Sequence, residues 1–280
     1  MPDIVGVFRE VEFSPGRVED DVAILSSTGR ALERRGHTVR LGGPEVLEHP
    51  DTPRLILAMC QSRPALEALD RHATSIPVVN APCAIRNCFR AETVRLLRKR
   101  HVPFPRTALV DTRTAAADTV APPCWVKRGD VHATDPADVV FAADPQAVTD
   151  ALASLAARGI HRAVVQEHVE GTLVKLYGII DGRFFRAYSA TAEPPASIES
   201  LWEVARAGAA ALGLEVFGGD VVVTAAGRVV AIDVNAWPSF ARCRDEAAEA
   251  IASYVCDLLA ARTGPVAGKG MTRDAGQARA

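Results

Sequence analysis

The segment AIDVNAWPSF, residues 231–240, places an acid and an amide inside what is otherwise an apolar strand. Side chains alternate along a strand, so Asp233 and Asn235 should point to one face, and Ile232 and Val234 to the other. A lone buried carboxylate costs several kcal/mol unless it is paired or bound to a metal. The strand therefore needs a partner that compensates for its polar face.

Asp220 begins the preceding strand of a predicted hairpin whose turn lies at residues 225–227. If the register sets Asp220 opposite Ala231 or Asp233, all three polar groups share one face, and a slip of one residue would separate them. Two carboxylates and an amide oxygen suit Mg²⁺, which usually needs phosphate oxygens and water to complete its octahedron. The alternative is a strand end whose polar groups bind backbone.

The lysines favour the metal hypothesis. Only four of the 32 cationic side chains are lysines, so a lysine inside an apolar strand of this arginine-rich chain calls for a functional reason. Lys127 in CWVKRG and Lys175 in TLVKLYG lie in apolar strand segments, where a strongly hydrated ammonium needs an anion. The chain has neither GxxxxGK[ST] nor GxGxxG. Two interior lysines beside an acidic cluster predict a magnesium–triphosphate site built without a P-loop.

The fold class expected is α/β and α+β. Short apolar strands alternate with helices up to residue 105, which is typical of an open, mostly parallel sheet. Strands are expected at residues 4–8, 37–42, 54–60 and 76–82, and helices at 20–35 and 64–72. A helix-rich piece at 83–100 leads into a strand at 102–110, followed by strands at 124–129, 138–143 and 162–169 and a helix at 145–158. From Gly171 the pattern changes to hairpins, with helices at 196–212 and 245–261.

Composition excludes some function classes. A net charge of −2 with no basic stripe argues against nucleic-acid binding. There is no signal pattern and no apolar run long enough to cross a membrane, so we expect a cytoplasmic protein. The six cysteines lack CxxC pairs and zinc spacing, and they are interpreted as reduced thiols that pack in the core.

With these residues in hand, the chain resembles the ATP-grasp superfamily over roughly residues 77–254. CWVKRG is similar to the strand that carries the nucleotide lysine, and VVQEHVEG to the hinge that meets the adenine edge. VKLYGIIDG matches the strand of the second cation, and GGDVV with AIDVNAWPSF matches the metal set. The resemblance implies an N-terminal domain (1–105), a central subdomain (106–170) and a C-terminal antiparallel subdomain with the metal site (171–263). The tail (264–280) is small, polar and aperiodic, so we expect it to be disordered.

The resemblance also implies roles for single residues. Lys127 would contact the nucleotide phosphates, and Lys175 would lie near the transferred phosphoryl group. The adenine cleft would be lined by Gln166, Glu167, His168 and Val169, mainly through the backbone of Glu167 and Val169. Asp220, Asp233 and Asn235 would hold Mg²⁺. ATP and Mg²⁺ are thus the expected cofactors.

The sequence departs from the family pattern in three places. Arg90 stands where the family helix commonly has a lysine, and a guanidinium binds phosphate differently from an ammonium. The loop after Lys127 has a single glycine and a central His132, which could close over the triphosphate or remain a solvent-exposed loop residue. An arginine expected near residues 189–190 is absent, and Arg186 is the closest candidate for that catalytic role.

The acceptor site has weaker signals. Arg9 and Arg17 frame the loop that leaves the first strand, where ligands bind in open α/β sheets, so they are candidates for holding an anionic substrate or are surface arginines. Arg242 and Arg244 could reach phosphate or face solvent. Cys83 and Cys88 are assigned to core packing, and Trp237 and Phe240 to packing under the metal loop.

The expected function is a carboxylate–amine ligase that forms an acyl phosphate and releases ADP. Its partners would be a small-molecule or peptide carboxylate and an amine, with no nucleic acid or membrane, and a homodimer is possible. Two alternatives stand beside it: a kinase that phosphorylates a hydroxyl, as in the inositol phosphate kinases, and a non-catalytic ATP-binding module.

Overall fold

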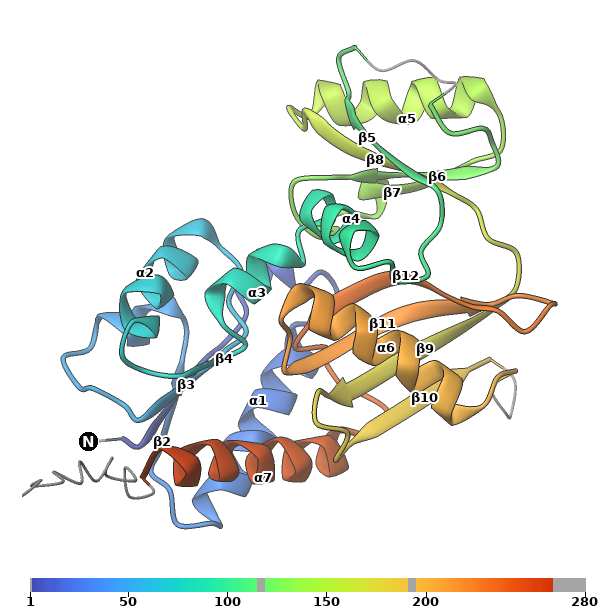
Figure 1. The fold of residues 1–280 in the computed structure, drawn as a ribbon. Coiled ribbons are helices and arrows are strands. Elements are labelled where there is room, and N and C mark those ends of the chain that lie inside the picture. The colour runs from blue at the N-terminus through green and yellow to red at the C-terminus, as the bar shows by residue number, and fades with distance from the viewer. Residues whose placement is uncertain (1, 115–118, 191–194, 264–280) are drawn as a thin grey trace, which may run out of the picture.

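The computed structural model describes residues 2–114, 119–190 and 195–263, which form three four-stranded sheets (Figure 1). The first sheet is parallel, in the order β2-β1-β3-β4, as the alternating pattern predicted. Its strands are β1 (Ile4–Val7), β2 (Val39–Gly42), β3 (Leu55–Ala58) and β4 (Val78–Val79). Its connections hold helices α1 (Val18–Glu33) and α2 (Arg63–Ala73) and the 3-10 turns Val11–Phe13 and Pro44–Glu48.

The second sheet is antiparallel, in the order β5-β8-β6-β7. Its strands are β5 (Thr107–Asp111), β6 (Cys124–Arg128), β7 (Val139–Ala142) and β8 (Arg162–Glu167), with the 3-10 turn Pro136–Asp138 before β7. Helix α5 (Pro145–Ala157) covers one face, where Val126 and Val165 pack against Leu152. Alternation along the strands therefore turns Lys127 and Gln166 to the opposite face.

The third sheet is also antiparallel, in the order β10-β9-β11-β12. Its strands are β9 (Thr172–Ile179), β10 (Phe185–Ser189), β11 (Val216–Val223) and β12 (Val229–Ala236). Helix α6 (Ile198–Leu212) covers one face, where Leu201 and Ala205 lie in one core with Val174 and Val221. The other face is left for polar side chains. Both predicted hairpins are present in this sheet.

The expected helix-rich piece at 83–100 is two helices, α3 (Pro82–Asn87) and α4 (Arg90–Lys99). They separate because Phe89 has an extended backbone, with ψ at 130°, and precedes the first turn of α4. The side chain of Asn87 donates to the Leu212 carbonyl at the end of α6, 3.0 Å away. Helix α4 contacts both α6 and β8, so it lies between the second and third sheets, as Figure 1 shows.

The first and third sheets are joined by buried hydrogen bonds. The fully buried Asn80 accepts from the backbone N–H groups of Glu215 (2.7 Å) and Val216 (2.9 Å) and donates to the Val216 carbonyl. The indole of Trp237 donates to the Val79 carbonyl at 2.9 Å. The last helix, α7 (Arg244–Thr263), packs against α1. Trp237 and Phe240 are fully buried, as predicted.

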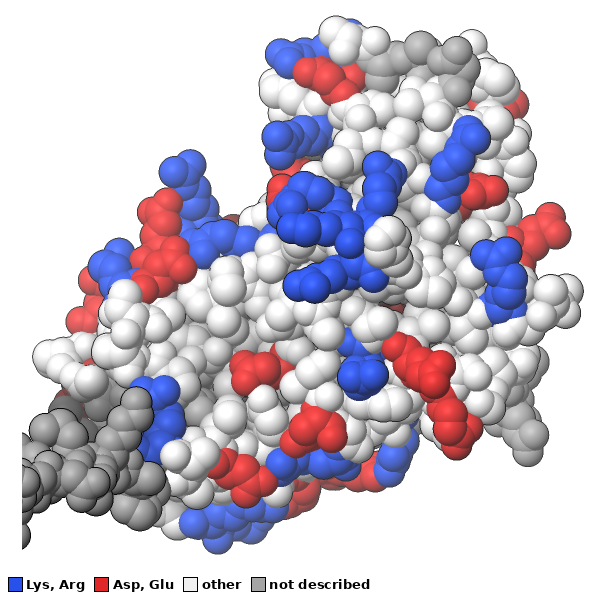
Figure 2. Space-filling view, in the orientation of Figure 1, with Lys and Arg blue, Asp and Glu red and all other residues white. Residues whose placement is uncertain are grey.

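Charged residues of both signs intermix over most of the face shown in Figure 2, with Lys and Arg gathered over α4. This cluster includes the exposed Arg95, Arg98 and Lys99, and cations in the last turn of a helix favourably face its dipole. No helix in the described ranges is long and apolar enough to cross a membrane. All six cysteines are free, but Cys83 is exposed, so its assignment to the core was wrong. The predicted disordered tail lies outside the described residues.

Candidate active site

The metal residues predicted from the sequence lie side by side on the open face of the third sheet. Asp220 is directly opposite Asp233 on β12 and Lys175 on β9, so these three side chains form one row across three strands. The next row runs from Tyr177 through Gly218 to Asn235. Opposite residues of antiparallel strands share a face. The register is therefore one of the two that the sequence analysis required.

A β-bulge between Asp220 and Val221 adjusts this register. Val221 pairs with Ala231, so that Ile232 and Asp233 together oppose Asp220. Ile232 was expected on the opposite face, but it lines a small cavity together with Asp233 because a bulge places two residues against one. This corrects the strict alternation assumed for the strand.

The two glycines before Asp220 are required by close packing. A Cβ on Gly219 would lie 2.4 Å from the Asp233 carbonyl oxygen, and one on Gly218 would lie 2.6 Å from the Pro238 ring. A side chain at either position would push β12 and its following loop away from β11. The GGD sequence therefore lets the two acidic strands approach each other closely.

The second sheet and α4 bring two cations to this row. Lys127 on β6 donates to the Gln166 side chain at 2.6 Å, and Arg90, at the start of α4, is 9% exposed. The Arg90 guanidinium donates a hydrogen bond to the Arg128 carbonyl, 3.4 Å away. Arg90, Lys127, Gln166 and Asp233 line one small cavity. Since a guanidinium has five N–H donors, Arg90 retains donors for an anion.

The ionisation of these groups reflects their burial and their mutual charge. Burial lowers the pKa of Lys127 to about 8. Burial raises the pKa of Asp220, and the Asp233 charge adds to that shift while Lys175 opposes it. Burial would also raise the pKa of Asp233, but the charges of Arg90, His132 and Lys127 outweigh it, so that the pKa is lowered. At neutral pH the site therefore combines the negative Asp220 and Asp233 with the positive Lys127, Arg90 and Lys175.

The loop after β6 is fixed by the fully buried Asp138. One carboxylate oxygen accepts from the backbone N–H groups of Thr134 (2.8 Å) and Asp135 (3.0 Å) and from Arg128 (3.1 Å), and the other accepts from Arg158 at 2.5 Å. Sequence reasoning missed this anchor, although the capping box over residues 135–138 was a visible signal.

His132, at the centre of this loop, is half-buried and faces the metal residues. It lines a cavity of about 250 Å³ with Arg90, Asp233 and Asn235. Burial lowers the pKa of His132 to about 4 against the attraction of Asp233, so the imidazole is neutral at pH 7. The alternative of a solvent-exposed loop histidine is therefore wrong for this arrangement.

Lys175 differs from the expectation of an interior lysine. Its side chain is 47% exposed, and its ammonium lies 3.1 Å from an Asp220 carboxylate oxygen. The Lys175 side chain projects from the open face of the sheet, whereas its apolar neighbours Val174 and Leu176 are buried. The apolar residues on either side therefore did not indicate that the lysine itself is buried. Its charge is still directed at the metal residues.

The donor set fits magnesium as part of a nucleotide complex. Two carboxylates and one amide gather, and the Asn235 amide donates to Asp233 at 3.1 Å. Within the described residues, no group of three His, Cys, Asp or Glu side chains is arranged to hold a metal by itself. Asp220, Asp233 and Asn235 would therefore hold Mg²⁺ together with phosphate oxygens.

The hinge after β8 offers backbone groups at the edge of the second sheet. The Glu167 N–H donates to the Arg106 carbonyl at 2.8 Å, and the His168 N–H donates to the Pro123 carbonyl at 3.1 Å. The Val169 N–H has no partner among the residues that the structure describes. The His168 ring accepts from the Trp125 indole at 3.1 Å. From this segment, the Val169 N–H is the donor available to an adenine ring.

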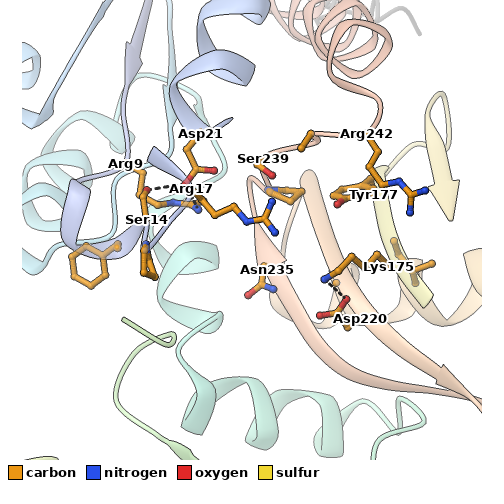
Figure 3. Close-up of a pocket in the computed structure, with 16 residues that line it drawn as sticks. Arg9, Ser14, Arg17, Asp21, Lys175, Tyr177, Asp220, Asn235, Ser239 and Arg242 are labelled. Carbon is orange, nitrogen blue, oxygen red and sulfur yellow. Dashed lines mark hydrogen bonds and ion pairs between the residues drawn. The ribbon is translucent and has the colours of Figure 1, made fainter. Parts of the chain in front are cut away.

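Beyond the row of Lys175, Asp220 and Asp233 (the metal row), a cavity of about 430 Å³ (the large cavity) lies between the loop after β1 and the third sheet. Figure 3 shows Arg17 reaching into it from one side and Arg242 lying near Tyr177 on the other, with Lys175 and Asp220 below. Arg242 was noticed in the sequence but was not assigned to the site. The signal that could have found it is its position in the loop that leaves the metal strand.

Two predicted site residues make ion pairs within the protein. Arg9 donates to Asp21 (3.0 Å) and to the carbonyls of Ala236 (3.1 Å) and Trp237 (2.6 Å), so it holds the β1 loop against the end of β12. Arg9 also lines the two cavities beside Asp220 and Asp233, and its role in holding a substrate stays a prediction. Arg186 pairs with Glu246 on α7 and is absent from the lining of the large cavity, so the structure does not bring it to the metal row.

Comparison with known proteins places this geometry in context. No protein-family model and no curated protein sequence matches the chain. The solved D-alanine–D-alanine ligase from Bacillus anthracis, complexed with ATP, aligns with a TM-score of 0.69 at 11% identity, over 92% of this chain and 98% of that one. A RimK domain ATP-grasp protein from Sphaerobacter thermophilus gives 0.66 at 19% identity, over 90% and 98%.

A third solved structure, the ATP-grasp ligase PsnB complexed with a minimal precursor, gives a TM-score of 0.63 at 18% identity, over 94% of this chain and 99% of that one. At these identities the likeness is one of fold. It extends over nearly the whole of each compared chain, and it agrees with the order of the motifs. The chain therefore has the ATP-grasp fold.

Proposed function

We propose that this protein is an ATP- and Mg²⁺-dependent carboxylate–amine ligase that releases ADP and phosphate. The observation that carries the proposal is the approach of Arg90 and Lys127 to Asp233 in one buried site. Burying two cations is costly unless an anion joins them. The two carboxylates would bind the metal ion of a Mg²⁺–triphosphate complex, and the two cations would neutralise its phosphate oxygens.

In the proposed reaction, a carboxylate oxygen of the substrate forms a bond to the γ-phosphorus as the bond from that phosphorus to ADP breaks. The amine then forms a bond to the acyl carbon, phosphate leaves with the acyl oxygen, and the nitrogen loses a proton. Magnesium, when bound, would neutralise phosphate oxygens and polarise the transferred group. Solved ATP-grasp ligases that this chain resembles are described with ATP, or with Mg and ADP.

The residues of this chain would act by position and charge. Lys127 and Arg90 would hold the phosphates from the side of the second sheet, and Lys175 would face the transferred group from β9. The Val169 N–H would donate to the adenine edge. Lys175 would exchange its contact with Asp220 for the phosphoryl oxygens, leaving that carboxylate to the metal.

The loop over residues 128–136 would exclude water from the acyl phosphate. Asp138 holds the base of this loop, and His132 projects from it into the cavity of Arg90 and Asn235. A neutral imidazole in this place would donate a hydrogen bond to a phosphate oxygen without adding charge. The N-terminal (1–105), central (106–170) and C-terminal (171–263) segments would act as the three units that enclose the substrates.

The hydroxyl kinase remains the second candidate because the large cavity carries Arg17 and Arg242, which suit phosphates as well as carboxylates. A kinase, however, needs a base to accept the hydroxyl proton. Of the carboxylates that line the cavity, Asp21 is bonded to Arg9 and Ser14, and Asp220 belongs to the metal row. A substrate carboxylate is already ionised and needs no base to accept the phosphoryl group, which favours the ligase for that step, whereas the proton of the amine is lost only in the second step.

The test is incubation with ATP, Mg²⁺, hydroxylamine and a panel of carboxylic acids. Hydroxamate formed in step with ADP is the expected result. A phosphorylated product without hydroxamate would support the kinase instead. Release of AMP and pyrophosphate would contradict both, and the Asp233→Ala variant serves as the inactive control.

A further inference from the structure

The large cavity carries more positive charge than the proposed phosphoryl transfer uses. Its wall includes Arg17 and Arg242, one on each side of Tyr177 and Ser239 in Figure 3. Lys175 and Asp220 lie on its floor and belong to the metal row. The two arginines are therefore a separate feature of the wall.

Neither arginine is neutralised by a close carboxylate. Arg17 is 59% exposed and lies 3.5 Å from Asp20, whose other oxygen is taken by Arg244 at 2.5 Å. Arg242 is exposed and stacks over the Tyr188 ring, with its guanidinium carbon 4.5 Å from the ring centroid. In the described part of the chain Arg242 has no ion-pair partner. Stacking fixes the plane of the guanidinium and leaves its N–H edge for a ligand.

The acids of the same wall are already paired. Asp21 accepts from Arg9 at 3.0 Å and from the Ser14 hydroxyl at 2.8 Å, and its side chain is 5% exposed. Asp220 is paired with Lys175. An ammonium group in this cavity would therefore meet the Arg242 guanidinium, the Arg17 guanidinium with only its long, exposed ion pair to Asp20, and no free carboxylate. A zwitterionic amino acid is disfavoured as the acid substrate.

We infer that the acid substrate carries a second oxyanion, carboxylate or phosphate, which Arg17 and Arg242 bind, and no ammonium group beside it. This inference rests on the proposed ligase function and names the substrate class of that site. The reacting carboxylate lies toward Lys175 and Asn235, and the second oxyanion lies toward the two arginines. Planar guanidinium forks match either oxyanion in a bidentate geometry.

The test measures binding rather than turnover. The full chain, saturated with Mg²⁺ and a non-hydrolysable ATP analogue, is titrated calorimetrically with butyrate, glutarate, adipate, 3-phosphonopropionate and glutamate. Glutarate, adipate or the phosphonate is expected to bind at least ~10-fold tighter than butyrate, the discrimination of one charge-assisted pair. The two kinds of dianion distinguish carboxylate from phosphate recognition.

Three variants test whether Arg17 and Arg242 cause the preference for dianions. Arg17→Gln and Arg242→Gln should each reduce dianion affinity about tenfold and leave butyrate binding unchanged. Arg228→Gln, an exposed arginine of the β11–β12 turn, is the matched control and should change neither. Thermal melting of each variant checks its fold. Equal binding of butyrate and the dianions, tighter binding of glutamate, or full dianion preference in both variants would overturn the inference.

This design separates the two proposals. If dianions bind with the expected preference but no acid yields hydroxamate or ADP, the ligase function fails and the anion site stands. If butyrate yields hydroxamate as efficiently as every dianion, the ligase function stands and the inferred substrate class is wrong.

Discussion

Asp220 lies directly opposite Asp233 across β11 and β12, so that two carboxylates face each other on the open side of the third sheet. Without a bound cation this arrangement costs stability, because burial and the Asp233 charge both raise the pKa of Asp220. A pair of facing carboxylates that destabilises the folded chain is explained if its role is to bind a cation.

Asp220→Asn should abolish ATP turnover while raising the thermal midpoint in magnesium-free buffer. The amide keeps the shape but removes a charge that the folded site disfavours, and a lost metal ligand should lower kcat by at least ~100-fold. Because the folded pKa is raised, the charge costs stability only above the ordinary pKa of 3.8, so the gain should vanish below that pH. Asp257→Asn, at an exposed ion pair on α7, is the control. A variant that melts below wild type at pH 7 would contradict this account.

Lys127 should make nucleotide binding depend on pH. Its pKa in the free protein is lowered to about 8, so the ammonium is present below that pH and is lost above it. The affinity for Mg·ATP, measured by calorimetry from pH 6.5 to 9.5, should fall as the pH rises through about 8. Lys127→Met should bind more weakly at every pH and show no such step. A step of the same size in the variant would assign it to another group.

Arg90 should act as the phosphate cation of α4. Arg90→Gln is expected to weaken Mg·ATP binding about 100-fold, since a hydrogen-bonded charge is removed from a buried anion site. Arg90→Lys should recover part of that loss, because an ammonium can bind phosphate without the planar fork. Arg95→Gln, on the exposed side of the same helix, should leave affinity unchanged. Equal affinities for Arg90→Gln and wild type would remove the residue from the site.

Protonation of His132 should lower the free energy of unfolding when the pH falls. Its folded pKa of about 4 is below the ordinary 6.5, so protonation favours the unfolded chain as the pH falls from about 6.5 toward 4. Urea unfolding at pH 7 and pH 5 should show wild type losing about 1–2 kcal/mol more than His132→Gln between these values. His132→Gln should also retain more ligase activity than His132→Ala, since an amide still donates a hydrogen bond. Identical acid sensitivity of the two proteins would disprove the buried, neutral state.

Arg9 should be needed for stability. Its ion pair with Asp21 is buried, with the two side chains 11% and 5% exposed. Arg9→Ala leaves that carboxylate unpaired and should cost about 3–5 kcal/mol in urea unfolding. Arg17→Ala should cost less than about 1 kcal/mol, because its ion pair is exposed and long. If both variants unfold at the same urea concentration, Arg9 does not hold the β1 loop to β12.

The strands, both hairpins and the set of polar residues on one face of β12 could be predicted from the amino-acid sequence alone. These are local properties, because alternation, turn residues and hydrophobic flanks act over a few positions. They were enough to predict that Asp220, Asp233 and Asn235 share one face, and the resemblance of the ordered motifs to the ATP-grasp superfamily predicted the fold. They also indicated Lys127 as a buried cation.

The partners of the long charged side chains could not be predicted, because they depend on how the chain folds. An arginine reaches several residues beyond its own position, so Arg9 binds the carbonyls that follow β12, Arg186 turns to α7, and Arg242 reaches the large cavity. The bulge at Asp220 and the anchoring of the β6–β7 loop by Asp138 likewise depend on partners distant in sequence. Strand periodicity fixes the face of a residue, but the partner of its charged end is set by what the fold brings within a few ångströms.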